Sequence, residues 1–326
     1  MTKCFAVPIM VLAVALLCAP RLAAQSGALQ TKTTQDHARP LWNSVPPLKS
    51  AYSTWKSKPA PKRDLSGIWD AAEADGGRQV SGNLGHLALY PAGKEMKENR
   101  GRRPDEYGGG TLGGHEDETG IANPLPYTPE GLAALKLNKP SGPGVRQVPI
   151  EETNDPLAVC DPSGFPYMEM YELRTIELVQ TPKQVIYLNQ YYGGHRVIWT
   201  DGRDLPKYPD PRFYGYSVGH WVDDYTFVVE TTGINERTWL DHAGRPHSDQ
   251  LRVEERFHRV DGDNMQLTVT IYDPKMYSEP WIALNKFPLH RMPDDFDIPE
   301  QLCSPVDVAA YNKAVNGATV SGPEKK

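Results

Sequence analysis

The densest group of side chains that could do chemistry lies in the segment 231–255. Its acid, base and cationic members, with one amide, are Asn235, Glu236, Arg237, Asp241, His242, Arg245, His247, Asp249 and Glu255. The segment joins two expected strands, so it forms a loop over one end of a sheet, where a rigid scaffold can position a site. A long loop is also polar simply because water surrounds it, so the segment is either a functional site or an ordinary solvated loop.

Glu255 is the most specific single candidate. It shares the alternation of Val253 and Phe257, which puts a carboxylate on an apolar strand face. Such a group would act as a general acid or base, or anchor a polar group of a ligand. The structural alternatives are a buried ion pair with Arg203 or Arg237, or a β-bulge that turns Glu255 toward solvent.

Acid–base catalysis would use a second residue of the same segment. Glu255 or Asp241 would act with His247, because a carboxylate can orient a histidine base. His242 and His247 could also hold a metal with Asp241 or Asp249, but their spacing matches no strong template. We therefore expect no metal and no cofactor, and whether the protein is an enzyme stays open.

Large aromatic side chains accompany these polar groups and either line a pocket or pack in the core. For a binding protein, the expected ligand contacts are Arg203, Trp199, Trp221, Arg237, Trp239 and His247. The ligand would be a small and largely apolar molecule that enters near 231–250.

The elements that must position these residues are short strands. Period-two alternation and turn residues predict strands at 176–180, 184–191, 196–200, 218–222, 225–231, 251–260 and 264–272. In the last, Met265, Leu267, Val269 and Ile271 share the apolar face. The pattern predicts a mainly β fold, an antiparallel meander that closes into a lipocalin-like barrel or a strongly curved sheet, with long irregular N-terminal segments. Thr128 and Pro129 predict a short helix that runs to Leu137.

The first residues have the layout of a secretory signal peptide. Lys3 precedes an apolar run, and the small residues Ala23 and Ala24 follow it. We expect a signal peptide at 1–24, a flexible arm at 25–63, one β-rich domain at 64–312 with a glycine-rich insertion at 73–120, and a flexible tail at 313–326. The expected location is periplasmic or secreted, with no integral membrane span after cleavage.

Cleavage would leave two cysteines, Cys160 and Cys303. In an oxidising compartment they most simply form one disulfide, and two buried free thiols are the alternative. The net charge of −6 argues against nucleic acid as a partner, and 39% hydrophobic residues argue against wholesale disorder. The expected partner is a small molecule.

Two resemblances extend this reading. Gly67-Ile68-Trp69, on the expected first strand, resembles the G-x-W signature of lipocalins. A longer series comprises Trp199-Thr-Asp-Gly-Arg203, Gly215-Tyr-Ser-Val-Gly-His-Trp221, Thr231-Thr-Gly-Ile-Asn-Glu-Arg-Thr-Trp-Leu-Asp241 and Gly244-Arg-Pro-His-Ser248. It resembles a widespread family of secreted, β-rich bacterial proteins. That resemblance implies export and a β-rich fold, and it assigns no catalytic residue.

Two functions therefore stay open, with a structural envelope protein as a weaker third. The first is a barrel that binds a small apolar ligand, whose polar group would meet Arg203, Arg237 or His247. The second is a hydrolase, lyase or isomerase that uses the 231–255 segment. Convergence of Asp241, His247 and Glu255 beside a cavity would favour the enzyme, and scattered side chains around an apolar cavity would favour binding.

Overall fold

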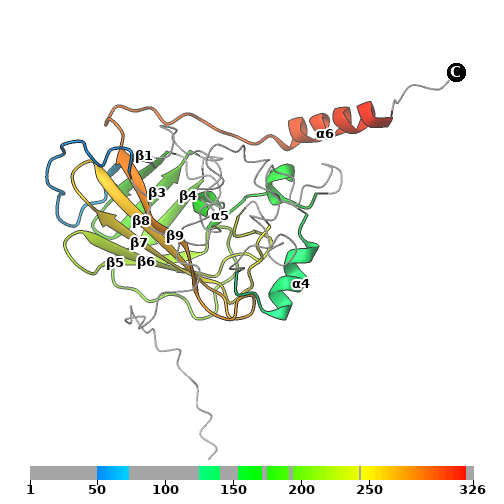
Figure 1. Ribbon diagram of the computed structural model, residues 1–326, viewed down its shortest axis with the longest axis horizontal. Helices are drawn as coiled ribbons and strands as arrows, with labels where there is room; N and C mark the ends of the chain where they lie inside the picture. The colour runs from blue at the N-terminus through cyan, green and yellow to red at the C-terminus, as the bar shows by residue number, and fades with distance from the viewer. Residues whose placement is uncertain are drawn as a thin grey trace, which may run out of the picture. The chain divides into compact units, whose positions relative to one another are not determined.

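The computed structural model describes residues 50–72, 125–139, 153–170, 175–190, 194–241 and 244–320. They form a closed barrel of nine strands that follow one another around the wall in chain order (Figure 1). The strands are β1 Gly67–Ala71, β2 Ile176–Gln180, β3 Gln184–Asn189, β4 His195–Trp199, β5 Tyr216–Trp221, β6 Thr226–Thr232, β7 Arg252–Arg259, β8 Asn264–Tyr272 and β9 Trp281–Arg291. The helices are α4 Pro129–Leu137, the 3-10 helix η3 Pro156–Val159, α5 Tyr167–Met170 and α6 Pro305–Val320. The predicted mainly β barrel is confirmed.

One step around the barrel departs from the expected antiparallel meander. β4 and β5 run parallel and pair at only two positions, Ile198 with Ser217 and Trp199 with Val218. All other neighbouring strands, including β1 and β9, pair antiparallel. A parallel pair needs a long connection that returns the chain to the starting end, and residues 200–215 supply it.

The expected core face of β8 is confirmed. Met265, Leu267, Val269 and Ile271 are all buried, whereas Thr268 between them is half-buried. Thr270, expected on the wet face, is also buried, and it pairs with Glu254 on β7 and Ile282 on β9. The division into a dry and a wet face therefore ends before the end of the strand.

An inward-facing arginine joins the start of β1 to the β7–β8 hairpin. Arg259 donates hydrogen bonds to the carbonyl oxygens of Asp64 and Gly262, both at 2.8 Å. Its guanidinium lies 4.6 Å from the centre of the Trp69 ring, and Trp69 Nε1 donates to the Leu65 carbonyl at 3.0 Å. Carbonyl dipoles and an aromatic face thus stabilise a cation that burial alone would disfavour.

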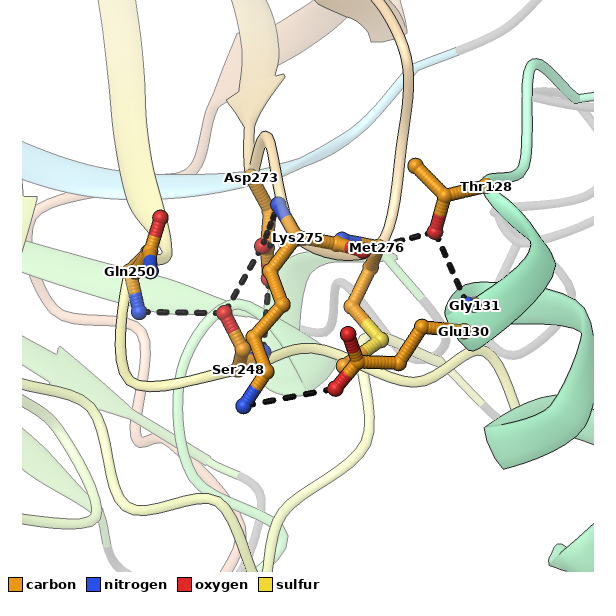
Figure 2. A network of polar contacts seen from close by, with 8 residues as sticks. All are labelled: Thr128, Glu130, Gly131, Ser248, Gln250, Asp273, Lys275 and Met276. Atoms are coloured by element: carbon orange, nitrogen blue, oxygen red, sulfur yellow. Dashed lines mark hydrogen bonds and ion pairs between the residues drawn. The ribbon is translucent and has the colours of Figure 1, made fainter.

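Helix α4 lies against the loop that follows β8, as Figure 2 shows. The Thr128 hydroxyl accepts from Gly131 N at 3.0 Å, which confirms the predicted N-cap, and donates to the Lys275 carbonyl at 2.6 Å. A Cβ at Gly131 would lie 2.1 Å from the Met276 carbonyl oxygen, so only glycine permits this approach.

The predicted disulfide is present between Cys160 and Cys303, with Cα atoms 5.5 Å apart. It joins the end of η3 to the segment before α6, and α6 includes residues 313–320 of the expected tail. The expected signal peptide, residues 25–49 of the arm, the 73–120 insertion and residues 321–326 lie outside the described residues. Within the described ranges, no helix is both long and apolar enough for a membrane crossing.

Candidate functional site

Four buried polar side chains meet inside the barrel: Glu169 on α5, Tyr187 on β3, Arg196 on β4 and Glu255 on β7. We call them the interior cluster. Tyr187 and Arg196 are direct partners across the β3–β4 pair. Arg196 Nη2 donates to Glu255 Oε1 at 2.6 Å. Because β5 and β6 separate β4 from β7 in the wall, this ion pair crosses the barrel interior.

Glu169 reaches the cluster because the chain before α5 turns tightly. Gly164 has φ +71°, and a Cβ there would lie 2.5 Å from the Phe213 carbonyl oxygen. Phe165 N donates to that same oxygen at 2.9 Å. The Phe165 ring then covers Arg196, with 4.0 Å between the guanidinium carbon and the ring centre. The segment therefore places an apolar ring against Arg196 and buries Glu169 completely.

Burial, and next the charge of Glu255, raise the pKa of Glu169 well above its ordinary value, and Arg196 opposes them only in part. Burial also raises the pKa of Tyr187 well above its ordinary value. Glu255 is the carboxylate that pairs with Arg196, so Glu169 is the carboxyl group that keeps its proton. The cluster then carries one positive and one negative charge.

Several polar atoms of the cluster make no hydrogen bond of good geometry within the described residues, although Glu169 lies close to Glu255 and Tyr187, and Tyr187 close to Asn189. These atoms are both carboxyl oxygens of Glu169, the Tyr187 hydroxyl, Nε and Nη1 of Arg196, and Oε2 of Glu255. Buried polar atoms in native proteins nearly always bond to protein or to ordered water. This concentration in one place indicates a site for a polar occupant.

A cavity of about 730 Å³ lies beside the short β4–β5 seam. Its lining residues are Cys160, Pro162, His195, Arg196, Val197, Trp199, Pro211, Arg212, Phe213, Tyr214, Gly215, Tyr216, Ser217, Leu302 and Cys303. We call it the seam pocket. Arg196 belongs both to this lining and to the interior cluster, and Ser217 likewise is an inward-facing residue. The pocket therefore follows the β4–β5 seam, from the start of β4, which has no partner on β5, to the paired residues Trp199 and Ser217.

Some of the expected ligand contacts gather at the seam pocket. Trp199 lines it, and the Arg203 guanidinium stacks 3.6 Å from the Trp199 ring centre while pairing with Asp201. Arg237 is exposed, pairs with Asp161 and lies 5.9 Å from the ring of Phe213, another lining residue.

The remaining expected contacts lie elsewhere. Trp221 packs against Phe227 at 5.2 Å between ring centres, and Trp239 is buried. His247 is also buried, with its ring nitrogens 2.8 Å from Thr238 Oγ1 and 3.2 Å from the Ser248 carbonyl oxygen. Burial lowers the pKa of His247, so its imidazole is neutral. These contacts hold the loop together.

The residues considered for acid–base work have different partners. Asp241 pairs with Arg245 in a fully buried ion pair, His247 bonds within its loop, and Glu255 pairs with Arg196. The alternatives that paired Glu255 with Arg203 or Arg237 are wrong, because both arginines are largely exposed and have aspartate partners.

A second polar network fixes the chain between β6 and β7 to the turn after β8 (Figure 2). Ser248 donates from N and Oγ to Asp273, at 2.6 and 2.8 Å, and Gln250 N donates to Ser248 Oγ at 3.1 Å. Lys275 pairs with Glu130 of α4 at 3.4 Å. This network is a scaffold. Within the described part of the chain, no three His, Cys, Asp or Glu residues form a group that could hold a metal, and His242 lies outside it.

Sequence reasoning missed Glu169, Tyr187 and Arg196, although alternation with Val185 and Ile198 could have placed the last two on the inner face.

The letters G-x-S-x-G also occur, at Gly215 to Gly219. They run along β5 rather than through a strand-to-helix turn, and Ser217 is buried with its hydroxyl 2.8 Å from that of Thr231. Ser217 therefore does not lie on a nucleophile elbow.

Comparisons of the chain with protein-family models, with curated proteins and with solved structures give no match.

Proposed function

We propose that this protein binds a small, largely apolar ligand that carries one polar group, and that the seam pocket is the binding site. The observation that carries the proposal is the cavity of about 730 Å³ with Trp199, Phe213 and Tyr216 in its lining and Arg196 at its boundary with the barrel interior. Ligand sites are typically cavities of roughly 300–1,000 Å³ with mostly apolar walls and a few polar groups.

The closed barrel supports this proposal, because a rigid wall can hold pocket residues from several strands in place. The Gly67-Ile68-Trp69 resemblance to lipocalins points to the same class of ligand-holding barrels. We further propose a periplasmic or secreted location. The Cys160–Cys303 disulfide supports it, since such bonds persist in oxidising compartments.

The test uses N-phenyl-1-naphthylamine, an uncharged probe that fluoresces in apolar sites, with the purified full chain. Trp199→Ala removes an aromatic wall of the pocket and should raise the Kd of the probe about 10-fold. The matched control is Trp55→Ala, because Trp55 is exposed and lies outside the pocket lining. Its Kd should stay within about twofold of wild type.

Absence of probe binding, or equal effects of the two tryptophan substitutions, would refute the seam pocket as the binding site. Native mass spectrometry of the protein purified from its own compartment then looks for a co-purified molecule, which would identify the ligand directly.

Acid–base catalysis is a second candidate, favoured by the two carboxyl groups of the interior cluster. The raised pKa of Glu169 keeps this group protonated beside Glu255, and a protonated carboxyl group next to a second carboxyl group can serve as the general acid of an enzyme. This version of the enzyme uses Glu169 and Glu255 in place of Asp241 and His247. If a substrate is found, Glu169→Gln should abolish turnover and leave probe binding unchanged.

A further inference from the structure

The interior cluster contains both kinds of hydrogen-bonding group. Arg196 offers donors at Nε and Nη1, Glu255 offers an acceptor at Oε2, and Glu169 and Tyr187 each offer a donor and an acceptor. All four side chains are at least nine-tenths buried. An occupant that satisfies them must therefore both donate and accept hydrogen bonds.

The charges of the cluster select against an ionic occupant. Arg196 and Glu255 already neutralise each other at 2.6 Å, and Glu169 carries a proton. A bound carboxylate would face the Glu255 carboxylate, and a bound ammonium would face the Arg196 guanidinium. Either would bring an uncompensated charge out of water, which is costly in a buried site. An uncharged group meets neither penalty.

The seam pocket touches the cluster at one residue. Arg196 is the residue that the two share, and the β4–β5 pairing ends beside it. An apolar ligand body against Trp199 and Phe213 would direct its polar end toward the Arg196 side of the pocket. The cluster would then recognise the head of the ligand, and the pocket its body.

We infer that the interior cluster binds the head group of the ligand, and that this head is uncharged and carries both a donor and an acceptor, as in a primary amide or an alcohol. The inference rests on the proposed function and narrows it to a class of ligand.

The test compares four compounds with the same chain and different heads: octanamide, 1-octanol, octanoate and octylammonium. Calorimetry at pH 7 on the full chain should give octanamide and 1-octanol a Kd about 10-fold or more below those of the two ions. Binding of octanamide should also release the same heat in phosphate as in Tris buffer, because no proton is exchanged. Equal affinities for all four compounds, or proton release on amide binding, would overturn the inference.

Tyr187→Phe tests the cluster itself, because it removes one hydroxyl of the cluster and keeps the ring beside Arg196. It should weaken octanamide about 2- to 10-fold, the value of one hydrogen bond. Tyr208→Phe is the control, since Tyr208 is 97% exposed. If Tyr187→Phe binds octanamide as wild type does, the cluster holds water only and the inference fails.

The two proposals fail differently. If Trp199→Ala weakens binding of the naphthylamine probe while the four octyl compounds bind with equal affinity, the seam pocket is supported as the binding site and the head-group inference is wrong. If neither the probe nor any octyl compound binds, both fall.

Discussion

Two chemically identical substitutions in the interior cluster should have very different effects on stability. Glu255→Gln removes the charge that pairs with Arg196 at 2.6 Å, where the two side chains are 0% and 2% exposed. Glu169→Gln replaces a carboxyl group that already carries a proton, so it exchanges one neutral group for another of nearly the same shape. The first should destabilise the fold and the second should not.

The magnitude follows from the geometry of the ion pair. Two unit charges about 4 Å apart attract by about 4 kcal/mol at an effective dielectric constant near 20. Removal of one member of a buried pair typically costs about 3–5 kcal/mol, because the other charge stays buried. Glutamine can still accept a hydrogen bond from Arg196, so we expect about 3 kcal/mol for Glu255→Gln. For Glu169→Gln we expect a loss within about 1 kcal/mol.

Urea unfolding at pH 7 measures both values, and a loss of about 3 kcal/mol should lower Tm by about 6–12 °C in a domain of this size. In Glu255→Gln, Glu169 can ionise and take over part of the pairing with Arg196. The double variant removes that relief, so its loss should exceed the sum of the single losses by at least about 0.5 kcal/mol. Equal losses for the two single variants, or a neutral Glu255→Gln, would refute the charge assignment.

Three further predictions concern pH, packing and the disulfide. Folding raises the pKa of Glu169, so the folded state binds this proton more tightly than the unfolded state does. The free energy of unfolding should therefore fall as the pH rises above the pKa of an unfolded glutamate, roughly 4.3, by up to about 1.4 kcal/mol per pH unit. Urea unfolding between about pH 5 and 8 should show this contribution in wild type but not in Glu169→Gln. Leu267→Ala should lower the free energy of unfolding by about 2–5 kcal/mol in urea, because it leaves a cavity in the core. Thr268→Ala should lower it by about 0.5–1 kcal/mol, because Thr268 is half-buried and accepts one hydrogen bond from Lys286 N. Similar losses for the two variants would contradict the inward register of β8. Reduction of Cys160–Cys303 should weaken naphthylamine binding, since both cysteines line the seam pocket; unchanged binding with two alkylated thiols would show that the disulfide does not shape it.

The parts of the fold that could be predicted are those that depend on neighbours in sequence. Period-two alternation located the strands β2 to β8 and the inward face of β8, and turn chemistry located the start of α4 after Thr128. The same alternation put Glu255 on the apolar face, and β7 does carry it inward between Val253 and Phe257. A local rule sufficed because each of these features repeats within one strand or one turn.

The rest depends on contacts between distant segments. The parallel direction of β5 is set by the path of residues 200–215, which has no sequence period of its own. Glu169 lies in α5, a helix of four residues that is too short to show a pattern. Glu169 reaches the interior only because Gly164 lies close to Phe213. Arg196 becomes the ion-pair partner of Glu255 only once the barrel closes.

The irregular step in the barrel and the candidate site have one physical origin. A longer ladder between β4 and β5 would make the wall separate an outer pocket from the interior. The β4–β5 pair stops after two residue pairs, so Arg196 stays in the wall without a backbone partner on β5 and borders both spaces. The long connection that makes the pair parallel also supplies Pro211 to Gly215 as lining, and the disulfide adds Leu302 and Cys303 from the far end of the chain. A polar cluster buried in a barrel costs stability unless its atoms find partners, and this gap is the place from which a ligand could provide them.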